Sequence, residues 1–161
     1  MTEHADPHPA PSFDSGTSTS TAAPLHTRAS AVALVGAGGL LGAPLRFQLG
    51  VWLPQSAGGW PVITFAINTA GAFLLGWLLE GLTELGPDTG RRQRSRLMLG
   101  TGFLGAFTTY STLAVDTDLL LRGQHWPAAV SYAVGTVFAG LVATIAGIAV
   151  GARSRRAEAS R

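Results

Sequence analysis

The stretch Thr101-Gly-Phe-Leu-Gly-Ala-Phe-Thr-Thr-Tyr-Ser-Thr-Leu-Ala-Val115 is the one around which the rest of this chain is organised. It lies in an uncharged run long enough to cross a bilayer, yet its middle holds Thr108, Thr109, Ser111 and Thr112 behind two glycines. Hydrocarbon offers no water to hydroxyls or to unwound backbone, so such a segment must face protein or a water-filled path. We therefore predict that the functional site lies here, at a break in a membrane-spanning helix.

The composition of the whole chain is that of a membrane protein. Of its 161 residues, 47% are hydrophobic and only 12% are charged, which is about half the charged fraction of ordinary soluble domains. The apolar residues are gathered into four blocks, at about 29–49, 62–79, 97–113 and 126–150. Each block is long enough for a membrane span. The sequence therefore predicts an all-α membrane protein, with four transmembrane helices in one domain at 29–150 and the third of them broken.

Two polar segments flank this domain. Residues 1–28 are rich in Ser, Thr, Pro, Ala and His and show no apolar periodicity, so we predict a disordered tail. A signal peptide is the alternative, but Glu3 and Asp6 stand where a basic region would be expected. Residues 151–161 are predicted to form a short basic tail in the cytoplasm.

The positions of the basic residues predict how the chain crosses the membrane. All eleven are arginine, and four of them lie between the second and third apolar blocks while four more close the chain. With both termini and the central loop in the cytoplasm, nine of the eleven arginines lie on that side, as the positive-inside rule requires. We therefore predict a multi-pass protein of the plasma membrane whose N- and C-termini are cytoplasmic.

Two polar side chains inside the apolar blocks have both structural and functional interpretations. Asn68 must be hydrogen-bonded within the membrane, and it either joins two helices or lines a pore. Arg46 comes late in the first block. It either extends to the headgroups from the helix end, or stays in the bundle as a cation beside an anion or a water-filled vestibule. The residues themselves leave both pairs of alternatives open.

Several other functions are disfavoured by what the sequence contains. It has no cysteine, and its four histidines all lie outside the apolar blocks, so a metal site built on either residue type is not expected. Neither a phosphate-binding glycine loop followed by lysine nor a nucleophile paired with a base is present in or beside the spans. We predict that the protein is not an enzyme and does not bind nucleic acid.

Three segments of the sequence resemble one known family. They are Gly42-Ala-Pro-Leu-Arg-Phe47, Thr64-Phe-Ala-Ile-Asn-Thr-Ala-Gly-Ala-Phe-Leu-Leu-Gly76 and Gly102-Phe-Leu-Gly-Ala-Phe-Thr-Thr-Tyr-Ser-Thr112. Together they are similar to the CrcB-like fluoride channels, also called Fluc channels, over about residues 31–150. The resemblance implies an antiparallel dimer of four-helix subunits. Its two narrow pores would let fluoride leave the cytoplasm passively and so lower its toxicity.

The resemblance also implies roles for individual residues. Arg46 is similar to an arginine near the cytoplasmic vestibule, where its charge would attract anions. Gly105 and Thr108 look like the positions whose backbone carbonyls hold a structural sodium ion on the dimer axis, and carbonyl oxygens at a helix break suit such a hard cation. The residues expected to line the pores are Asn68, Thr64, Tyr110, Ser111, Thr112, Leu113, Tyr132 and Thr136.

Two features depart from the family pattern. The family usually has two phenylalanines three residues apart on the third helix, where this chain has Tyr110 and Leu113, and leucine lacks the positive ring edge that attracts an anion. An antiparallel homodimer also calls for a balanced charge on the two sides of the membrane, which these arginines do not give. We therefore hypothesise, as the alternative to a homodimer, a heterodimer with an oppositely oriented homologue.

Two other functions remain open from the sequence. A small proton-coupled multidrug exporter also has four helices per subunit, but its mechanism needs an acidic residue near the middle of the membrane, and the first apolar block has none. The other alternative is a non-conducting partner subunit, in which Asn68 and the small residues only pack helices together. Fluoride flux through liposomes distinguishes the three functions.

Overall fold

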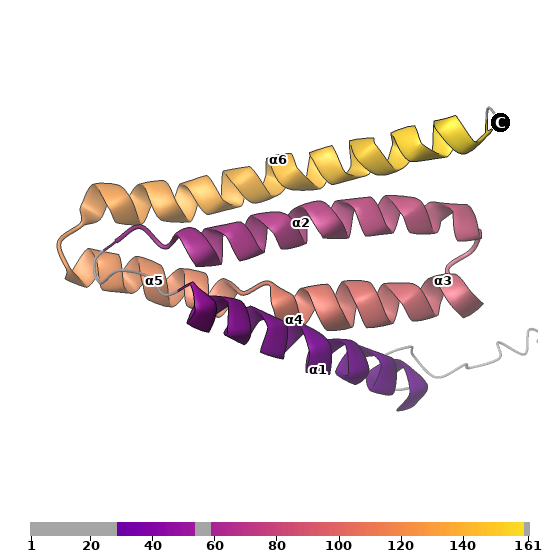
Figure 1. The fold of residues 1–161 in the computed structure, drawn as a ribbon, viewed down its shortest axis with the longest axis horizontal. Helices are drawn as coiled ribbons and strands as arrows, with labels where there is room; N and C mark the ends of the chain where they lie inside the picture. The colour runs from indigo at the N-terminus through magenta and orange to yellow at the C-terminus, as the bar shows by residue number, and fades with distance from the viewer. Residues whose placement is uncertain (1–28, 54–58, 160–161) are drawn as a thin grey trace, which may run out of the picture.

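The computed structural model describes residues 29–53 and 59–159, and this part of the chain is helical without strands (Figure 1). The elements are α1 (Ala29–Trp52), α2 (Val62–Leu82), the 3₁₀ turn η2 (Thr83–Leu85), α3 (Gly90–Ser95), the π-helical η3 (Arg96–Leu104), α4 (Gly105–Phe107), α5 (Tyr110–Arg122) and α6 (Trp126–Ala159). The tail predicted at residues 1–28 lies outside the described residues.

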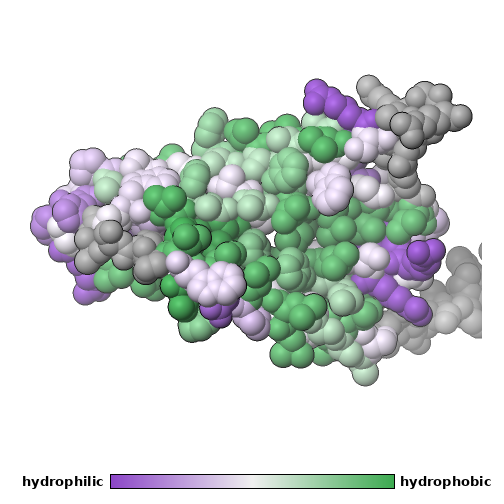
Figure 2. Space-filling view, viewed as in Figure 1, coloured by the Kyte–Doolittle hydropathy of each residue, from purple (hydrophilic) through white to green (hydrophobic). Residues whose placement is uncertain are grey.

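Three of these helices are long and apolar enough to cross a membrane. They are α1, α2 and the part of α6 from Trp126 to Ser154. Apolar side chains cover the middle of the bundle and polar ones gather at its two ends (Figure 2). The prediction of an all-α membrane protein is confirmed at this level. Helix α6 continues to Ala159, so the basic tail begins as a continuation of the last span.

Helices α2 and α6 run side by side in the same direction (Figure 1). Their contact depends on glycines that leave no room for a side chain. A Cβ on Gly147 would lie 2.8 Å from the backbone nitrogen of Trp77, and one on Gly76 would meet the backbone of Thr144. Small residues let helix backbones approach closely in a membrane, and here they bring the backbones of α2 and α6 into direct contact.

Helix α1 packs in the same manner against η3. A Cβ on Gly102 would lie 3.0 Å from the Cα of Gly38, and one on Gly42 would meet the backbone of Phe103 and lie 3.1 Å from the nitrogen of Phe107. The wide π-helical turns of η3 therefore lie directly against the first span. This contact fixes the helical segment just before the hydroxyl-rich stretch.

The segments η3, α4 and α5 follow one another beside α2 and run against its direction (Figure 1). Between α4 and α5 the chain leaves the helical conformation. Thr108 has φ −77° and ψ 159°, and Thr109 has φ −149° and ψ 121°. We call these two extended residues the interruption. Threonine is branched at Cβ and fits this extended backbone better than most residues do.

The two ends of the bundle differ in charge. The start of α1, the loop before α3 and the end of α6 lie at one end (Figure 1), together with most of the arginines. Arg96 pairs there with Asp88, with 2.7 Å between Nη2 and Oδ2. The hydrogen bond from Arg96 holds the pKa of the Asp88 carboxyl below its usual value. This pair braces the turn that connects α2 to η3.

Candidate functional site

The interruption is held by hydrogen bonds from its own threonines. The amide and the hydroxyl of Thr108 both donate to the carbonyl of Leu104, each at 2.9 Å, which closes the last turn of α4. The hydroxyl of Thr109 accepts from the amide of Thr112 at 3.1 Å and so caps the start of α5. A threonine at such a position satisfies a donor that the helix leaves without a partner.

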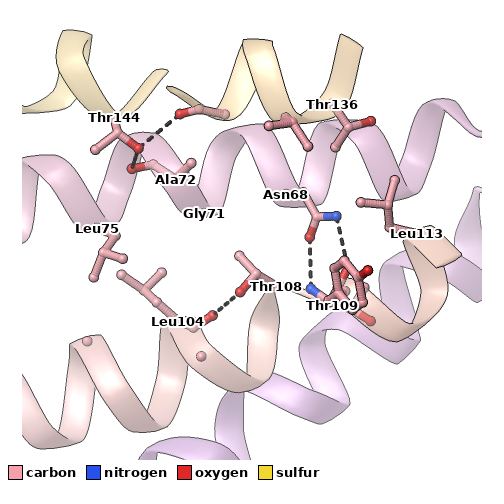
Figure 3. A pocket seen from close by; sticks show the side chains of 15 residues that line it. Asn68, Gly71, Ala72, Leu75, Leu104, Thr108, Thr109, Leu113, Thr136 and Thr144 are labelled. Carbon is pink, nitrogen blue, oxygen red and sulfur yellow. Dashed lines mark hydrogen bonds between the residues drawn. The ribbon is translucent and has the colours of Figure 1, made fainter. Parts of the chain in front are cut away.

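Asn68 on α2 binds the interruption from the side (Figure 3). Its Nδ2 donates to the carbonyl of Thr109 at 3.0 Å, and its Oδ1 accepts from the amide of the same residue at 2.8 Å. One side chain therefore satisfies both polar groups of a residue that has left the helix. These two hydrogen bonds give the Asn68 amide its partners within an apolar helix, and they join α2 to the interrupted segment.

The same bonds change the environment of two backbone carbonyls. In a continuous helix the amides of Thr109 and Thr112 would donate to the carbonyls of Gly105 and Thr108, four residues earlier. Here these amides donate to Asn68 Oδ1 and to Thr109 Oγ1 instead. The carbonyls of Gly105, at the start of α4, and of Thr108, in the interruption, are therefore left without these helical donors.

An open groove of about 360 Å³ lies beside the interruption, between α2, α6 and the segment η3–α5. Most of its wall is apolar. Its polar side chains are Asn68, Thr108, Thr109, Tyr110, Thr136 and Thr144. Tyr110 is 82% exposed and stands at the start of α5, whereas Leu113 in the same wall is buried. The groove is thus open and largely apolar, with a small number of polar groups in its wall.

The threonine hydroxyls of this groove are already engaged. Thr136 donates to the carbonyl of Tyr132 at 2.7 Å, Thr144 donates to that of Gly140 at 2.9 Å, and Thr109 donates to Thr112 Oγ1 at 3.0 Å. Asn68 has a second N–H on Nδ2 beyond the one bonded to Thr109. This N–H and the Tyr110 hydroxyl are hydrogen-bond donors that the described residues of the groove can present to a bound ligand.

A carboxylate lies one helical turn beyond the groove. Asp116 Oδ2 accepts hydrogen bonds from Thr64 Oγ1 at 2.8 Å and from Tyr132 Oη at 3.1 Å. Thr64 and Tyr132 are both buried. Trp60 covers this cluster, with its ring 5.4 Å from that of Tyr132 in an edge-on contact. The cluster joins α2, α5 and α6 at one level of the bundle.

Replacing Tyr132 by phenylalanine is expected to lower the free energy of unfolding by about 1–2 kcal/mol, because Asp116 then loses one of the two donors to Oδ2. Unfolding of the purified protein in detergent measures this change. The matched control is Tyr110→Phe. The Tyr110 side chain is largely exposed, so the loss of its hydroxyl should alter the free energy of unfolding by less than about 0.5 kcal/mol. Equal losses in the two variants would contradict the assignment.

The structure separates the predicted site residues into three groups. The groove is lined by Asn68, Tyr110, Leu113 and Thr136, together with Gly105 and Thr108. Thr64 and Tyr132 belong to the carboxylate cluster around Asp116. Ser111 and Thr112 bond to the hydroxyl of Thr109, at 3.1 and 3.0 Å. All eight predicted lining residues therefore lie at or next to the interruption or the cluster, but four of them do not line the groove itself.

Arg46 lies at the level of the interruption on the side of α1. Its Nε donates to the carbonyl of Ala106 at 3.3 Å, and its Nη1 donates to Thr112 Oγ1 at 3.5 Å. The side chain is half-buried. The guanidinium is therefore bonded to the interrupted segment on the side of α1.

Asp116 is not among the site residues predicted from the sequence. It follows the third apolar block, two residues before Asp118 and six before Arg122. Asp118 and Arg122 do form an exposed pair four residues apart, at 2.6 Å. Asp116 instead follows Leu113 by three residues and precedes Leu120 by four, and both leucines are buried. That spacing on one helix face was the available signal.

The sequence was compared with known proteins. Residues 33–148 match the family described as "CrcB-like protein, Camphor Resistance (CrcB)". A relative from Leifsonia xyli, named "Fluoride-specific ion channel FluC 2", is 49% identical over 80% of this chain and 88% of its own length. "Fluoride-specific ion channel FluC 3" of Streptomyces avermitilis is 45% identical over 77% of this chain and 59% of its own length.

A third relative, "Fluoride-specific ion channel FluC" of Oceanobacillus iheyensis, is 43% identical over 68% of this chain and 82% of its own length. The matched region of the family covers most of α1, all of α2, the interruption and most of α6. The family named by the resemblance of the three segments is thereby confirmed. This multi-pass membrane protein belongs to the CrcB-like family.

Proposed function

We propose that this chain is a subunit of a fluoride-specific channel that lets fluoride leave the cytoplasm passively. The observation that carries the proposal is the 49% identity, over four-fifths of the chain, to a relative named as a fluoride-specific ion channel. The structure supports it with a groove beside the interruption that carries a small number of polar side chains. The function is transport rather than catalysis.

Fluoride is small and strongly hydrated, so its passage needs hydrogen-bond donors that replace water in stages. The second N–H of Asn68 is one such donor, and the hydroxyl and the ring edge of Tyr110 provide others. Asn68 is fixed by its two bonds to Thr109, so it meets the ion without reorganising. The positive charge of Arg46, at the same level of the bundle, favours an anion there.

The third span of the channel is formed by η3, α4 and α5, with the interruption in its middle, and the channel is an antiparallel dimer. Tyr110 and Ser111 are exposed on the surface of a single subunit, next to the extended backbone of the interruption. In hydrocarbon such polar groups need partners. A second subunit that covers this face supplies them and closes the open side of the groove.

A structural sodium ion is held at the interruption by the carbonyls of Gly105 and Thr108. The amides that would bond these two carbonyls in a helix donate elsewhere, and a backbone carbonyl is the kind of oxygen ligand that a hard cation prefers. The bound ion would contribute positive charge that stabilises the backbone there. Thermal stability should therefore rise as sodium takes the place of a large organic cation in the buffer at constant ionic strength. A melting temperature that does not depend on sodium would reject the site.

The orientation of the chain follows from its arginines, with both termini in the cytoplasm. Single cysteines at Ser95→Cys and Gly123→Cys test it, because the native chain has no cysteine. Ser95 ends α3 and Gly123 directly follows α5, and these two helices lie at opposite ends of the bundle (Figure 1). If the subunit inserts in one direction, a membrane-impermeant thiol reagent in intact cells labels position 123 and leaves position 95 unlabelled. Labelling of both positions would show insertion in both directions and would favour a homodimer over a heterodimer.

Fluoride efflux from liposomes, followed with a fluoride electrode, tests the function itself. Liposomes that contain the chain, alone or with an oppositely oriented homologue, should release fluoride at a rate set by the applied potential and should retain chloride. Efflux with the homologue only would identify this chain as a partner subunit. Absence of fluoride flux in both cases, or drug transport driven by a pH gradient, would refute the proposal.

A further inference from the structure

One guanidinium contacts the chain on both sides of the interruption. Arg46 donates through Nε to Ala106, in the last turn before the interruption, and through Nη1 to Thr112, in the first turn after it. The donor–acceptor distances are 3.3 and 3.5 Å. The two acceptors are six residues apart in the sequence. The side chain therefore bridges the end of α4 and the start of α5.

The contact at Thr112 continues into a chain of polar groups. Thr112 Oγ1 also accepts from Thr109 Oγ1 at 3.0 Å, and the backbone of Thr109 is bonded at both its amide and its carbonyl to Asn68. Arg46 extends from α1 and Asn68 from α2. The interrupted segment is therefore held by hydrogen bonds from side chains of two different helices.

The interruption needs such external bonds because the alternative conformation does not. A continuous helix through residues 105–112 would satisfy its own backbone groups, and this is the favoured solution in hydrocarbon. Because Thr108 and Thr109 are extended, the amides of Thr109 and Thr112 donate to side-chain oxygens instead of to helix carbonyls. Every bond that is made only in the interrupted state shifts the balance toward it.

The chemistry of the bridge requires an arginine. A guanidinium presents N–H groups at Nε and at both Nη atoms in a rigid planar fork, so it can bond two separated acceptors at once. Lysine carries the same charge on one flexible nitrogen and loses the fixed geometry. An electrostatic role of Arg46 and a bridging role therefore differ in whether lysine can replace it.

We propose that Arg46 is a positioning residue whose two hydrogen bonds bridge the interruption from the side of α1. With Asn68, this bridge, which we call the clasp, keeps the third span in its interrupted conformation where the ion passes. The consequence for flux rests on the proposed channel function. The clasp itself is a conformational property that can be measured without flux. It acts in addition to any attraction that the charge of Arg46 exerts on anions.

The test compares Arg46→Lys with Arg46→Gln by amide hydrogen exchange of the purified full chain, followed by mass spectrometry. In both variants, exchange in peptides covering 106–113 should rise about tenfold or more, as expected for the loss of hydrogen bonds from a charged donor, while peptides of α2 and α6 keep their protection. The matched control is Arg122→Lys, in an exposed ion pair with Asp118. It should leave exchange at 106–113 unchanged.

Fluoride flux is measured on the same variants, and both Arg46 variants should lose it. Wild-type exchange and flux in Arg46→Lys, with a loss in Arg46→Gln, would show that only the charge matters and would overturn the clasp. A wild-type protein without fluoride flux would refute the channel function, but the exchange data would still decide on the clasp.

A second variant protects the test against a general loss of folding. Thr112→Val keeps the shape of the side chain and removes the acceptor of Nη1. It should also raise exchange at 106–113. In the double variant Arg46→Lys/Thr112→Val the two effects should be clearly less than additive, since both changes break the same bridge. Full additivity of the two effects would overturn the proposal.

Discussion

Replacement of Asn68 by aspartate is expected to reduce fluoride flux by at least about a hundredfold, which corresponds to about 2.7 kcal/mol. The new carboxylate keeps the acceptor for the amide of Thr109 but turns an oxygen toward the carbonyl of Thr109, where Nδ2 now donates. A buried carbonyl that loses its donor costs about 1–3 kcal/mol. The added negative charge also repels an anion in a medium of low dielectric constant. Fluoride efflux from liposomes measures the loss.

The neighbouring residue supplies the matched control for this variant. The hydroxyl of Thr69 is buried and has no hydrogen-bond partner among the described residues. Thr69→Val has nearly the same shape and should leave flux and stability close to the wild-type values. If Asn68→Asp conducted as well as Thr69→Val, neither the bond to Thr109 nor the donor role of Asn68 could be maintained.

Replacement of Gly38 by alanine is expected to prevent stable packing of α1 and to lower the free energy of unfolding by about 3 kcal/mol or more. The added Cβ would lie 2.6 Å from the nitrogen of Phe103 and 2.9 Å from the Cα of Gly102, and it would also meet the carbonyl of Met98. All three are backbone atoms of η3, so no side-chain rotation relieves the clash. Unfolding of the purified protein in detergent measures the effect.

Gly36 provides the comparison within the same helix. A Cβ at Gly36 meets nothing within 4 Å, and alanine is a better helix former than glycine by about 1 kcal/mol. Gly36→Ala should therefore be neutral or slightly stabilising. A similar loss of stability in both variants would mean that the contact between α1 and η3 is not as tight as described.

The sequence predicted the helices well because their signals are local. The apolar blocks at about 29–49, 62–79 and 126–150 correspond to α1, α2 and α6. The first two helices end about three residues past their blocks, whereas α6 continues about nine residues past 150. Length and hydrophobicity decide a span without reference to the rest of the fold. The glycines and hydroxyls of 101–115 likewise indicated an irregular backbone, and the chain is extended at Thr108 and Thr109.

The sequence could not assign partners to the polar residues of the spans. Asn68 was open between joining helices and lining a pore, and the structure shows that it bonds the Thr109 backbone while it also lines the groove. Asp116 stands two residues before the exposed pair Asp118–Arg122 in the sequence, yet it bonds Thr64 and Tyr132. These contacts join residues 16 to 52 positions apart, and no local pattern encodes them.

The sequence by itself thus determined that this is a helical membrane protein, which family it resembles, and where its backbone departs from a helix. These properties depend on hydrophobicity, on residue type and on short motifs, all of which act within a few turns of chain. Which side chains stabilise that departure depends on the packing of the helices. Asn68 and Arg46 reach it from α2 and α1 because glycines let these helices approach closely, and that approach exists only in the packed bundle.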